Sequence, residues 1–278
     1  MTDDWAAEDT ASGGNWEDFD TGVAHSARVY DYWLGGKDNF AADRAVGDIV
    51  VQAFPDVVLT ARANRAFLGR TVAFLAADAG IRQFLDIGTG IPAANNTHQV
   101  AQAIAPQTRV VYVDNDPIVL SHARALLASH PAGITGYLDA DLRDPERILQ
   151  DAASTLDFTQ PIALMLIAVL HFITDDDNPH QIVATLLDAL PPGSYLALTH
   201  GTKDIVTVSQ NVARATMNGL NRSMAEQVTL RDRATVERFF AGLELVEPGL
   251  VPASQWRPDA EADPDQPIGL WSGIGRKR

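Results

Sequence analysis

Short apolar segments alternate with longer segments of mixed polarity along most of the chain. The apolar segments are continuous rather than alternating, which predicts strands that are buried on both faces, as in a parallel sheet covered by helices. Alternation of such strands with helices predicts an α/β fold with an open, doubly wound sheet. The predicted strands are 83–87, 109–113, 134–138, 162–167, 195–199, 243–246 and 268–275. The predicted helices of this region are 93–104, 118–129, 144–155, 179–189, 204–224 and 231–241.

A helical pattern precedes the first strand. It covers residues 25–54 but is interrupted at Gly35 and Gly36, which predicts two short helices joined by a tight turn. Residues 59–79 predict a longer helix that ends at Gly80. The first twenty residues carry seven acids and no Lys or Arg, a composition typical of disorder. We therefore expect a disordered acidic tail at 1–22, an N-terminal helical extension at 23–80 and an α/β domain at 81–278.

Composition narrows the classes of protein to consider. A hydrophobic share of 46% suits a globular core, and no window approaches the roughly 18 apolar residues of a membrane helix. The net charge of -15 disfavours nucleic acid as a partner and favours a small-molecule or protein substrate. The acidic start does not resemble a secretory signal, and the absence of cysteine excludes disulfides and thiolate metal sites. We expect a cytoplasmic protein that does not enter the membrane.

The clearest motif lies where the first predicted strand ends. Asp86, Gly88 and Gly90 form an Asp-x-Gly-x-Gly turn that a helix follows. Glycines let the backbone turn sharply beside a ligand, and open α/β sheets bind ligands at this edge, although a turn without a ligand fits too. A dinucleotide site has Gly or Ala at the third position, whereas Pro92 stands near it here. Asp86 repels phosphate and attracts an amino group, which favours an amino-acid-like ligand over NAD.

Two further strands also end in acids. Asp114 closes the second strand, where a carboxylate accepts hydrogen bonds from ribose hydroxyls of NAD or S-adenosylmethionine. The nearby Asp116 fits a helix cap instead. Asp141 follows the third strand, where it is placed to accept from an adenine amino group while Leu142 packs on the ring. Taken singly, Asp141 also fits a solvated loop acid.

Taken together, the three acids at the strand ends point to a resemblance between this sequence and a known family. The sequence resembles class I methyltransferases, and more closely an actinobacterial family of predicted S-adenosylmethionine-dependent methyltransferases. The resembling segments are 27–32, 34–40, 83–92, 96–98, 110–117, 239–243 and 255–258. The resemblance implies a seven-stranded, mostly parallel Rossmann-like sheet with a reversed last strand, the N-terminal helices as a lid, and bound S-adenosylmethionine. The predicted cofactor contacts are Asp86, Gly88, Gly90, Asp114, Asn115, Asp141, Leu142 and Ala168.

The substrate is expected beyond the fourth strand. His171 ends that region, and an imidazole titrates near physiological pH, so this side chain is a candidate base; packing beside Phe172 is the alternative. The acidic run 175–177 fits a solvated loop, and no metal site is predicted. The predicted substrate contacts, which equally fit a packed core, are Arg28, Tyr32, Trp33 and Trp256.

These interpretations predict a methyltransferase that moves the methyl group of S-adenosylmethionine to a small molecule. Such transfer depends mainly on in-line positioning, because the sulfonium carries its own leaving group. Two other functions stay open at this point. One is a regulatory protein that binds the cofactor without turnover, and the other is an NAD-dependent oxidoreductase.

Overall fold

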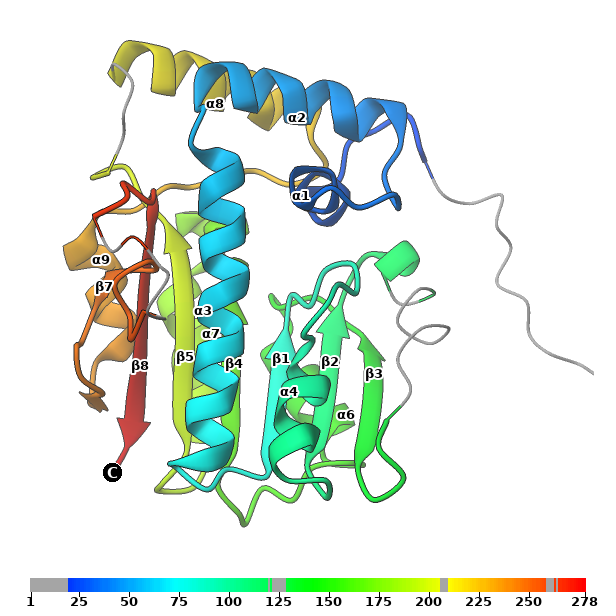
Figure 1. Ribbon diagram of the computed structural model, residues 1–278, viewed down its shortest axis with the longest axis vertical. Helices are drawn as coiled ribbons and strands as arrows, with labels where there is room; N and C mark the ends of the chain where they lie inside the picture. Colours follow the sequence, from blue (N-terminus) through cyan, green and yellow to red (C-terminus); the bar gives the residue numbers. More distant parts are fainter. Residues whose placement is uncertain (1–19, 120, 122–128, 206–209, 259–262, 264) are drawn as a thin grey trace, which may run out of the picture.

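The computed structural model of the chain describes residues 20–119, 121, 129–205, 210–258, 263 and 265–278. Within them, a central sheet has helices on both faces and a helical cap across one end (Figure 1). Most of the expected acidic tail at 1–22 and most of the expected helix at 118–129 lie outside the described residues. None of the described helices is long and apolar enough to cross a membrane.

Over the described residues, the sheet has eight strands in the order β3-β2-β1-β4-β5-β8-β6, with β7 paired to β8 beside this path. Neighbouring strands from β3 to β5 run parallel, whereas β8 is antiparallel to β5 and β6. This confirms a doubly wound, mostly parallel sheet with a reversed last strand; the short β7 adds an eighth strand to the expected seven. The strands are β1 (Gln83–Ile87), β2 (Arg109–Asp114), β3 (Ile134–Asp139), β4 (Ala163–Ile167), β5 (Tyr195–Gly201), β6 (Leu243–Leu245), β7 (Val251–Pro252) and β8 (Leu270–Lys277).

Buried side chains cover both faces of the sheet. Phe84 and Leu85 are neighbours in β1, are both fully buried, and belong to two different apolar clusters. Continuous apolar strands are explained by this burial on both sides. One face is covered by α3 (Val57–Ala77) and α4 (Thr97–Ile104). The other is covered by α6 (Pro145–Ala152), α7 (Pro179–Asp188), α9 (Arg233–Glu237) and η4 (Arg238–Phe240), with η2 (Leu170–Phe172) and η3 (Asp175–Asp177) preceding α7.

The start of α4 differs from the expected residue 93. Asn95 takes a left-handed conformation with φ 61°, and Asn96 then caps the helix. The side chain of Asn96 accepts from the backbone N–H of residue 99, and the Gln99 side chain accepts from the backbone N–H of Asn96 at 2.9 Å. A capping box therefore begins the helix at Thr97.

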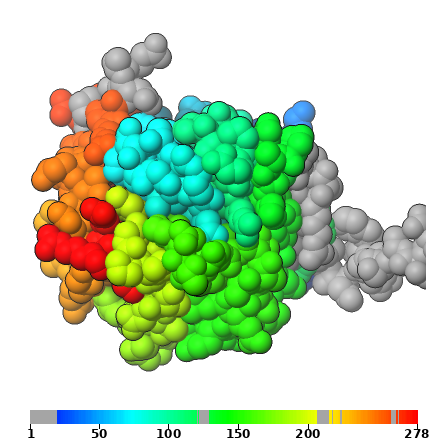
Figure 2. All heavy atoms as spheres, turned by 90° about the horizontal axis from the view of Figure 1, so that it is seen from below, coloured from blue at the N-terminus to red at the C-terminus, as the bar shows by residue number. Residues whose placement is uncertain are grey.

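The cap consists of α1 (Ser26–Leu34), α2 (Ala41–Ala53) and α8 (Gln210–Ser223). The two short N-terminal helices are confirmed, and the turn between them begins at Gly35, whose φ of 82° suits glycine. Val29, Val50 and Leu220 pack in an apolar cluster separate from both faces of the sheet. The parallel strands point toward this cap (Figure 1). Figure 2 shows the end of the molecule opposite the cap, where α3, α4 and the turns beside the strands pack together.

Candidate active site

A cavity of about 340 Å³ lies between the carboxyl ends of the parallel strands and the cap. It is the place where an open α/β sheet binds ligands, since the strand order reverses between β1 and β4. Eight predicted cofactor contacts line it together: Asp86, Gly88, Gly90, Asp114, Asn115, Asp141, Leu142 and Ala168. His171 and Trp33 line the same cavity.

The glycine turn after β1 is shaped to receive a ligand. Gly88 and Gly90 have φ of 75° and 65°, a region that other residues enter at a cost. A Cβ on Gly88 would lie 2.4 Å from the Val169 side chain, so packing requires this glycine. The Cβ direction of Gly90 meets no heavy atom within 4 Å, so its backbone borders open space. Gly90 thus forms a cradle that a side chain would fill.

Asp86 lies beside this turn and is buried, with 4% of its surface exposed. Burial raises the pKa of its carboxyl to about 6, against the opposing effects of the Thr97 hydroxyl and of Arg65. Thr97 donates to Oδ2 of Asp86 at 2.6 Å. A buried carboxylate favours a cation beside it, so the site suits the ammonium of an amino-acid moiety.

Asp114 connects the end of β2 to the glycine turn. Its Oδ2 accepts from the backbone N–H of Gly90 at 2.8 Å, and its Oδ1 accepts from that of Asp116 at 3.0 Å. Burial raises the pKa of Asp114, and these two hydrogen bonds lower it in part. A carboxylate has about four acceptor positions, which leaves capacity for two ribose hydroxyls. Next to it, Asn115 donates to Asp141 at 3.1 Å, so these two side chains orient each other.

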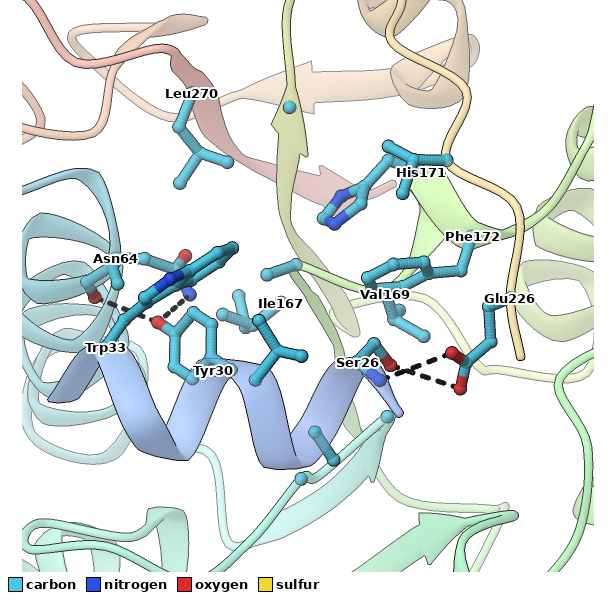
Figure 3. Close-up of a pocket in the computed structure, with 18 of the residues that line it drawn as sticks. Ser26, Tyr30, Trp33, Asn64, Ile167, Val169, His171, Phe172, Glu226 and Leu270 are labelled. Atoms are coloured by element: carbon cyan, nitrogen blue, oxygen red, sulfur yellow. Dashed lines mark hydrogen bonds between the residues drawn. The ribbon is translucent and has the colours of Figure 1, made fainter. Parts of the chain in front are cut away.

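The turn after β4 carries the residues that the sequence predicts for the substrate side. Ala168 takes a left-handed conformation with φ 56°, and its N–H donates to the Thr199 hydroxyl at 2.8 Å. Three residues later His171 faces the cavity together with Val169 and Phe172 (Figure 3). Burial, assisted by His200 and Arg231, lowers the pKa of His171 to about 3. This imidazole is therefore neutral at physiological pH.

Arg231 holds the loop that carries His171. Its guanidinium, with 3% of the residue exposed, donates to the carbonyls of Leu170 and Ile173 at 3.1 and 2.8 Å. It also lies 2.9 Å from Nε2 of His200, whose Nδ1 lies 2.7 Å from a backbone carbonyl and must donate to it. His200 is thus a neutral acceptor toward Arg231, and burial lowers its pKa to about 4. Arg231 and His200 hold this loop from outside the cavity lining.

Three of the four predicted substrate contacts lie elsewhere. Arg28 is 5% exposed and pairs with Asp43 at 3.3 Å inside the cap. Tyr32 donates its hydroxyl to Asp48 at 2.8 Å, and Trp256 is fully buried against Phe67 and Phe74 on one face of the sheet. None of these three residues lines the cavity. We therefore assign them structural contacts in place of the expected contacts with the substrate. The reason is that aromatic and polar residues at helical spacing give the same pattern in a core as in a pocket.

Residues far apart in the chain close the cavity, and they are not predictable from the sequence. Glu226, which follows α8, pairs with Nε2 of His25 and accepts from both the N–H and the hydroxyl of Ser26 at 3.2 Å (Figure 3). Nδ1 of His25 lies 3.1 Å from Oδ2 of Asp116, whose Oδ1 accepts from the N–H of Ile118 at 2.8 Å. No local pattern marks Glu226, because its partners are 200 residues away.

These features define a class I methyltransferase domain: a sheet with a reversed last strand, the glycine cradle and the acids at the strand ends. The site is suited to S-adenosylmethionine. A family model described as S-adenosyl methyltransferase matches residues 12–278. The chain belongs to this family and is an S-adenosylmethionine-dependent methyltransferase. This membership decides between the cofactors that the strand-end acids left open.

Solved structures agree with this assignment. A DUF574 family protein from Streptomyces avermitilis is 46% identical, with a TM-score of 0.88 over 93% of this chain and 99% of that one. A candidate methyltransferase from Thermobifida fusca is 43% identical, with a TM-score of 0.84 over 93% of this chain and 97% of that one. An O-methyltransferase family protein from Burkholderia thailandensis, 15% identical with a TM-score of 0.50 over 80% of this chain and 60% of that one, shows the fold alone. A search of curated proteins finds no match.

Proposed function

We propose that the enzyme methylates a small, largely apolar molecule that carries no negative charge, inside the cavity beneath the cap. The observation that carries this proposal is the continuity of one cavity, which runs from the strand-end acids to an apolar wall. That wall is formed by Val29, Trp33, Val50, Phe54 and Leu220. A covered, apolar space suits a small molecule better than a nucleic acid, in keeping with the net charge of -15.

The cofactor is proposed to lie along the strand ends. Asp86 and the Gly90 cradle receive its amino-acid end, Asp114 receives the ribose, and Asp141 with Leu142 receives the adenine. When bound, S-adenosylmethionine supplies an electrophilic methyl group and its own leaving group, because the carbon–sulfur bond breaks as the acceptor atom bonds to the methyl carbon. The protein's contribution is to orient both reactants and to exclude water.

The charges of the cavity support an acceptor without negative charge. Asp86, Asp114 and Asp141 line the cofactor side. The arginines among the described lining residues are Arg65 and Arg143, and both are engaged. Arg65 donates to a backbone carbonyl at 2.7 Å, and Arg143 pairs with Asp141 at 3.1 Å. An anionic acceptor would therefore have to compete with the backbone carbonyl for Arg65 or with Asp141 for Arg143.

His171 is proposed to orient the acceptor as a neutral hydrogen-bond partner. Its low pKa, caused first by burial and then by His200 and Arg231, disfavours the imidazolium that full proton transfer would create. The expected role as a base is less compatible with these surroundings than orientation is. A cytoplasmic location also stays a prediction from the sequence.

Methyl transfer from labelled cofactor tests the proposal. We expect S-adenosylmethionine with a labelled methyl group to label a neutral, organic-soluble compound in a cell extract freed of macromolecules. The Asp114→Ala variant is the control, because loss of the ribose contact should abolish labelling at limiting cofactor. If macromolecules are left in the extract and the label appears only in protein or nucleic acid, the proposal of a small-molecule acceptor would be contradicted.

A further inference from the structure

A chain of four hydrogen bonds, one of them fully buried, crosses from the cap to the turn after β4. The N–H of Ala168 donates to the hydroxyl of Thr199 at 2.8 Å, and that hydroxyl donates to Oδ1 of Asn64 at 2.8 Å. On its other side, Nδ2 of Asn64 donates to the hydroxyl of Tyr30 at 2.9 Å. Tyr30 in turn donates to the carbonyl of Ala61 at 2.9 Å. The chain thus joins β4, β5, α3 and α1.

The direction of every bond in this chain is fixed by its two ends. A backbone N–H only donates and a backbone carbonyl only accepts, so each hydroxyl between them must pass its own proton onward. Asn64 is therefore held with Oδ1 toward Thr199 and Nδ2 toward Tyr30. Burial raises the pKa of Tyr30, which keeps its hydroxyl protonated and able to donate. The four bonds form one continuous arrangement, and linked hydrogen bonds of this kind strengthen each other.

The two ends of the chain are functional surfaces. Ala168 lines the cavity in a left-handed conformation, which costs a non-glycine residue of the order of 1 kcal/mol or more and must be held by its surroundings. At the other end, Tyr30 lies on the helix that presents Trp33 to the same cavity (Figure 3). Asn64 stands between them on α3, is 3% exposed, and also lines the cavity.

We propose that Asn64 is a positioning residue, which fixes the cap helix α1 relative to the strained turn at Ala168. It acts through Tyr30 on one side and through Thr199 on the other. The cap is then held in one position over the cofactor, with the apolar wall and His171 on facing sides of the acceptor. This inference rests on the proposed placement of S-adenosylmethionine beside Ala168.

A double-mutant cycle tests this coupling. Thr199→Val removes the hydroxyl that joins Ala168 to Asn64, and Tyr30→Phe removes the hydroxyl on the other side. The readout is the affinity for S-adenosylhomocysteine by calorimetry. We expect each single variant to weaken binding. If the two losses were independent, the fold-losses in affinity would multiply. We expect the double variant to bind at least about threefold more tightly than that product predicts. In an Asn64→Leu background the same cycle should become additive.

A matched control separates positioning from simple loss of stability. Val72 is fully buried on α3 and lies outside the cavity lining, so Val72→Ala destabilises the same helix without touching the chain. We expect S-adenosylhomocysteine to increase amide protection at residues 26–34 in the wild type and in Val72→Ala, but not in Asn64→Leu.

The outcomes distinguish this inference from the proposed function. Wild-type protein that does not bind S-adenosylhomocysteine would overturn the cofactor placement and, with it, the role of Asn64. Normal wild-type binding with an additive cycle would overturn the role of Asn64 alone. Equal loss of affinity in Val72→Ala and Asn64→Leu would do the same, since it would show that any destabilisation of α3 suffices.

Discussion

At the scale of single residues, Asp86 links cofactor binding to pH. Its carboxyl has a pKa of about 6, and an ammonium group is attracted only by the ionised form. We expect the affinity for S-adenosylhomocysteine to rise between pH 5 and pH 7 and then level off, measured by calorimetry in buffers of matched ionic strength. In Asp86→Asn the affinity should be lower and this rise should disappear. A profile that is flat in the wild type would contradict the assignment.

The same carboxyl weakens the cofactor-free fold. Its pKa is raised from 3.8 to about 6, so the folded state holds a proton that the unfolded state releases in this range. Stability from this group is therefore lost as the pH rises from 3.8 to 6 and stays lost above it. We expect cofactor-free Asp86→Asn to unfold at a higher temperature than the wild type at pH 7.5, although it binds the cofactor less tightly. Thermal unfolding with and without S-adenosylhomocysteine measures both effects.

Gly90 and Gly80 form a matched pair. Their φ values are 65° and 71°, and the Cβ direction of each meets open space. Gly90→Ala and Gly80→Ala should each cost about 1 kcal/mol of stability for the left-handed backbone. Only Gly90→Ala fills the cradle, so we expect it alone to weaken S-adenosylhomocysteine binding, by about tenfold or more. Equal affinities of the two variants would show that the ligand does not approach Gly90.

At the scale of elements, the contact between α1 and the segment after α8 depends on charge. Burial alone would lower the pKa of His25, but Glu226 and Asp116 raise it above 6.5 overall. Burial alone would raise the pKa of Glu226, but His25 lowers it below 4.5. The stability from His25 is complete below pH 6.5 and is lost as the pH rises through its folded-state pKa, whereas that from Glu226 is lost in acid. The contact is therefore strongest between about pH 4.5 and 6.5.

We expect the cap to loosen in alkali. Amide protection factors, which correct for the intrinsic pH dependence of exchange, should fall at residues 24–30 and 225–228 between pH 6.5 and pH 9. The β1 and β4 amides serve as the internal reference and should not change. Glu226→Gln should show low protection of the cap at every pH. Protection that is independent of pH in the wild type would argue against a charged His25.

The elements were more predictable than the contacts between them. The strands that carry Asp86, Asp114 and Asp141 follow from continuous apolar segments, and parallel strands bring their carboxyl ends to one edge of a sheet. Glu226 and Asn64 carry no such local signal, because their positions depend on how distant helices pack. A Trp-Arg-Pro loop fits a cavity mouth as well as a core, so the sequence alone does not separate a substrate contact from a core position for Trp256. The start of α4 was missed because an asparagine in a left-handed conformation delays it.

At the scale of the whole molecule, the sheet and the cap have separate apolar clusters. Trp256 follows β7 and belongs to the apolar cluster on the α3 face of the sheet, where its ring centre lies 5.4 Å from that of Phe67. Trp256→Ala should therefore cost about 3–5 kcal/mol in unfolding free energy. We expect the protein that remains folded to bind S-adenosylhomocysteine with wild-type affinity, measured by denaturant titration and calorimetry. A selective loss of affinity would restore Trp256 as a ligand contact.

The cap draws its helices from two distant parts of the chain. Ser26 meets Glu226 across a separation of 200 residues, so this contact closes a very long loop. Contacts of this kind form slowly, because the entropy of the intervening chain must be lost first. During translation, α1 and α2 leave the ribosome long before α8 is made. A nascent chain can thus build much of the sheet while its active site is still open, and the reaction chamber is completed only after α8 and Glu226 have been made.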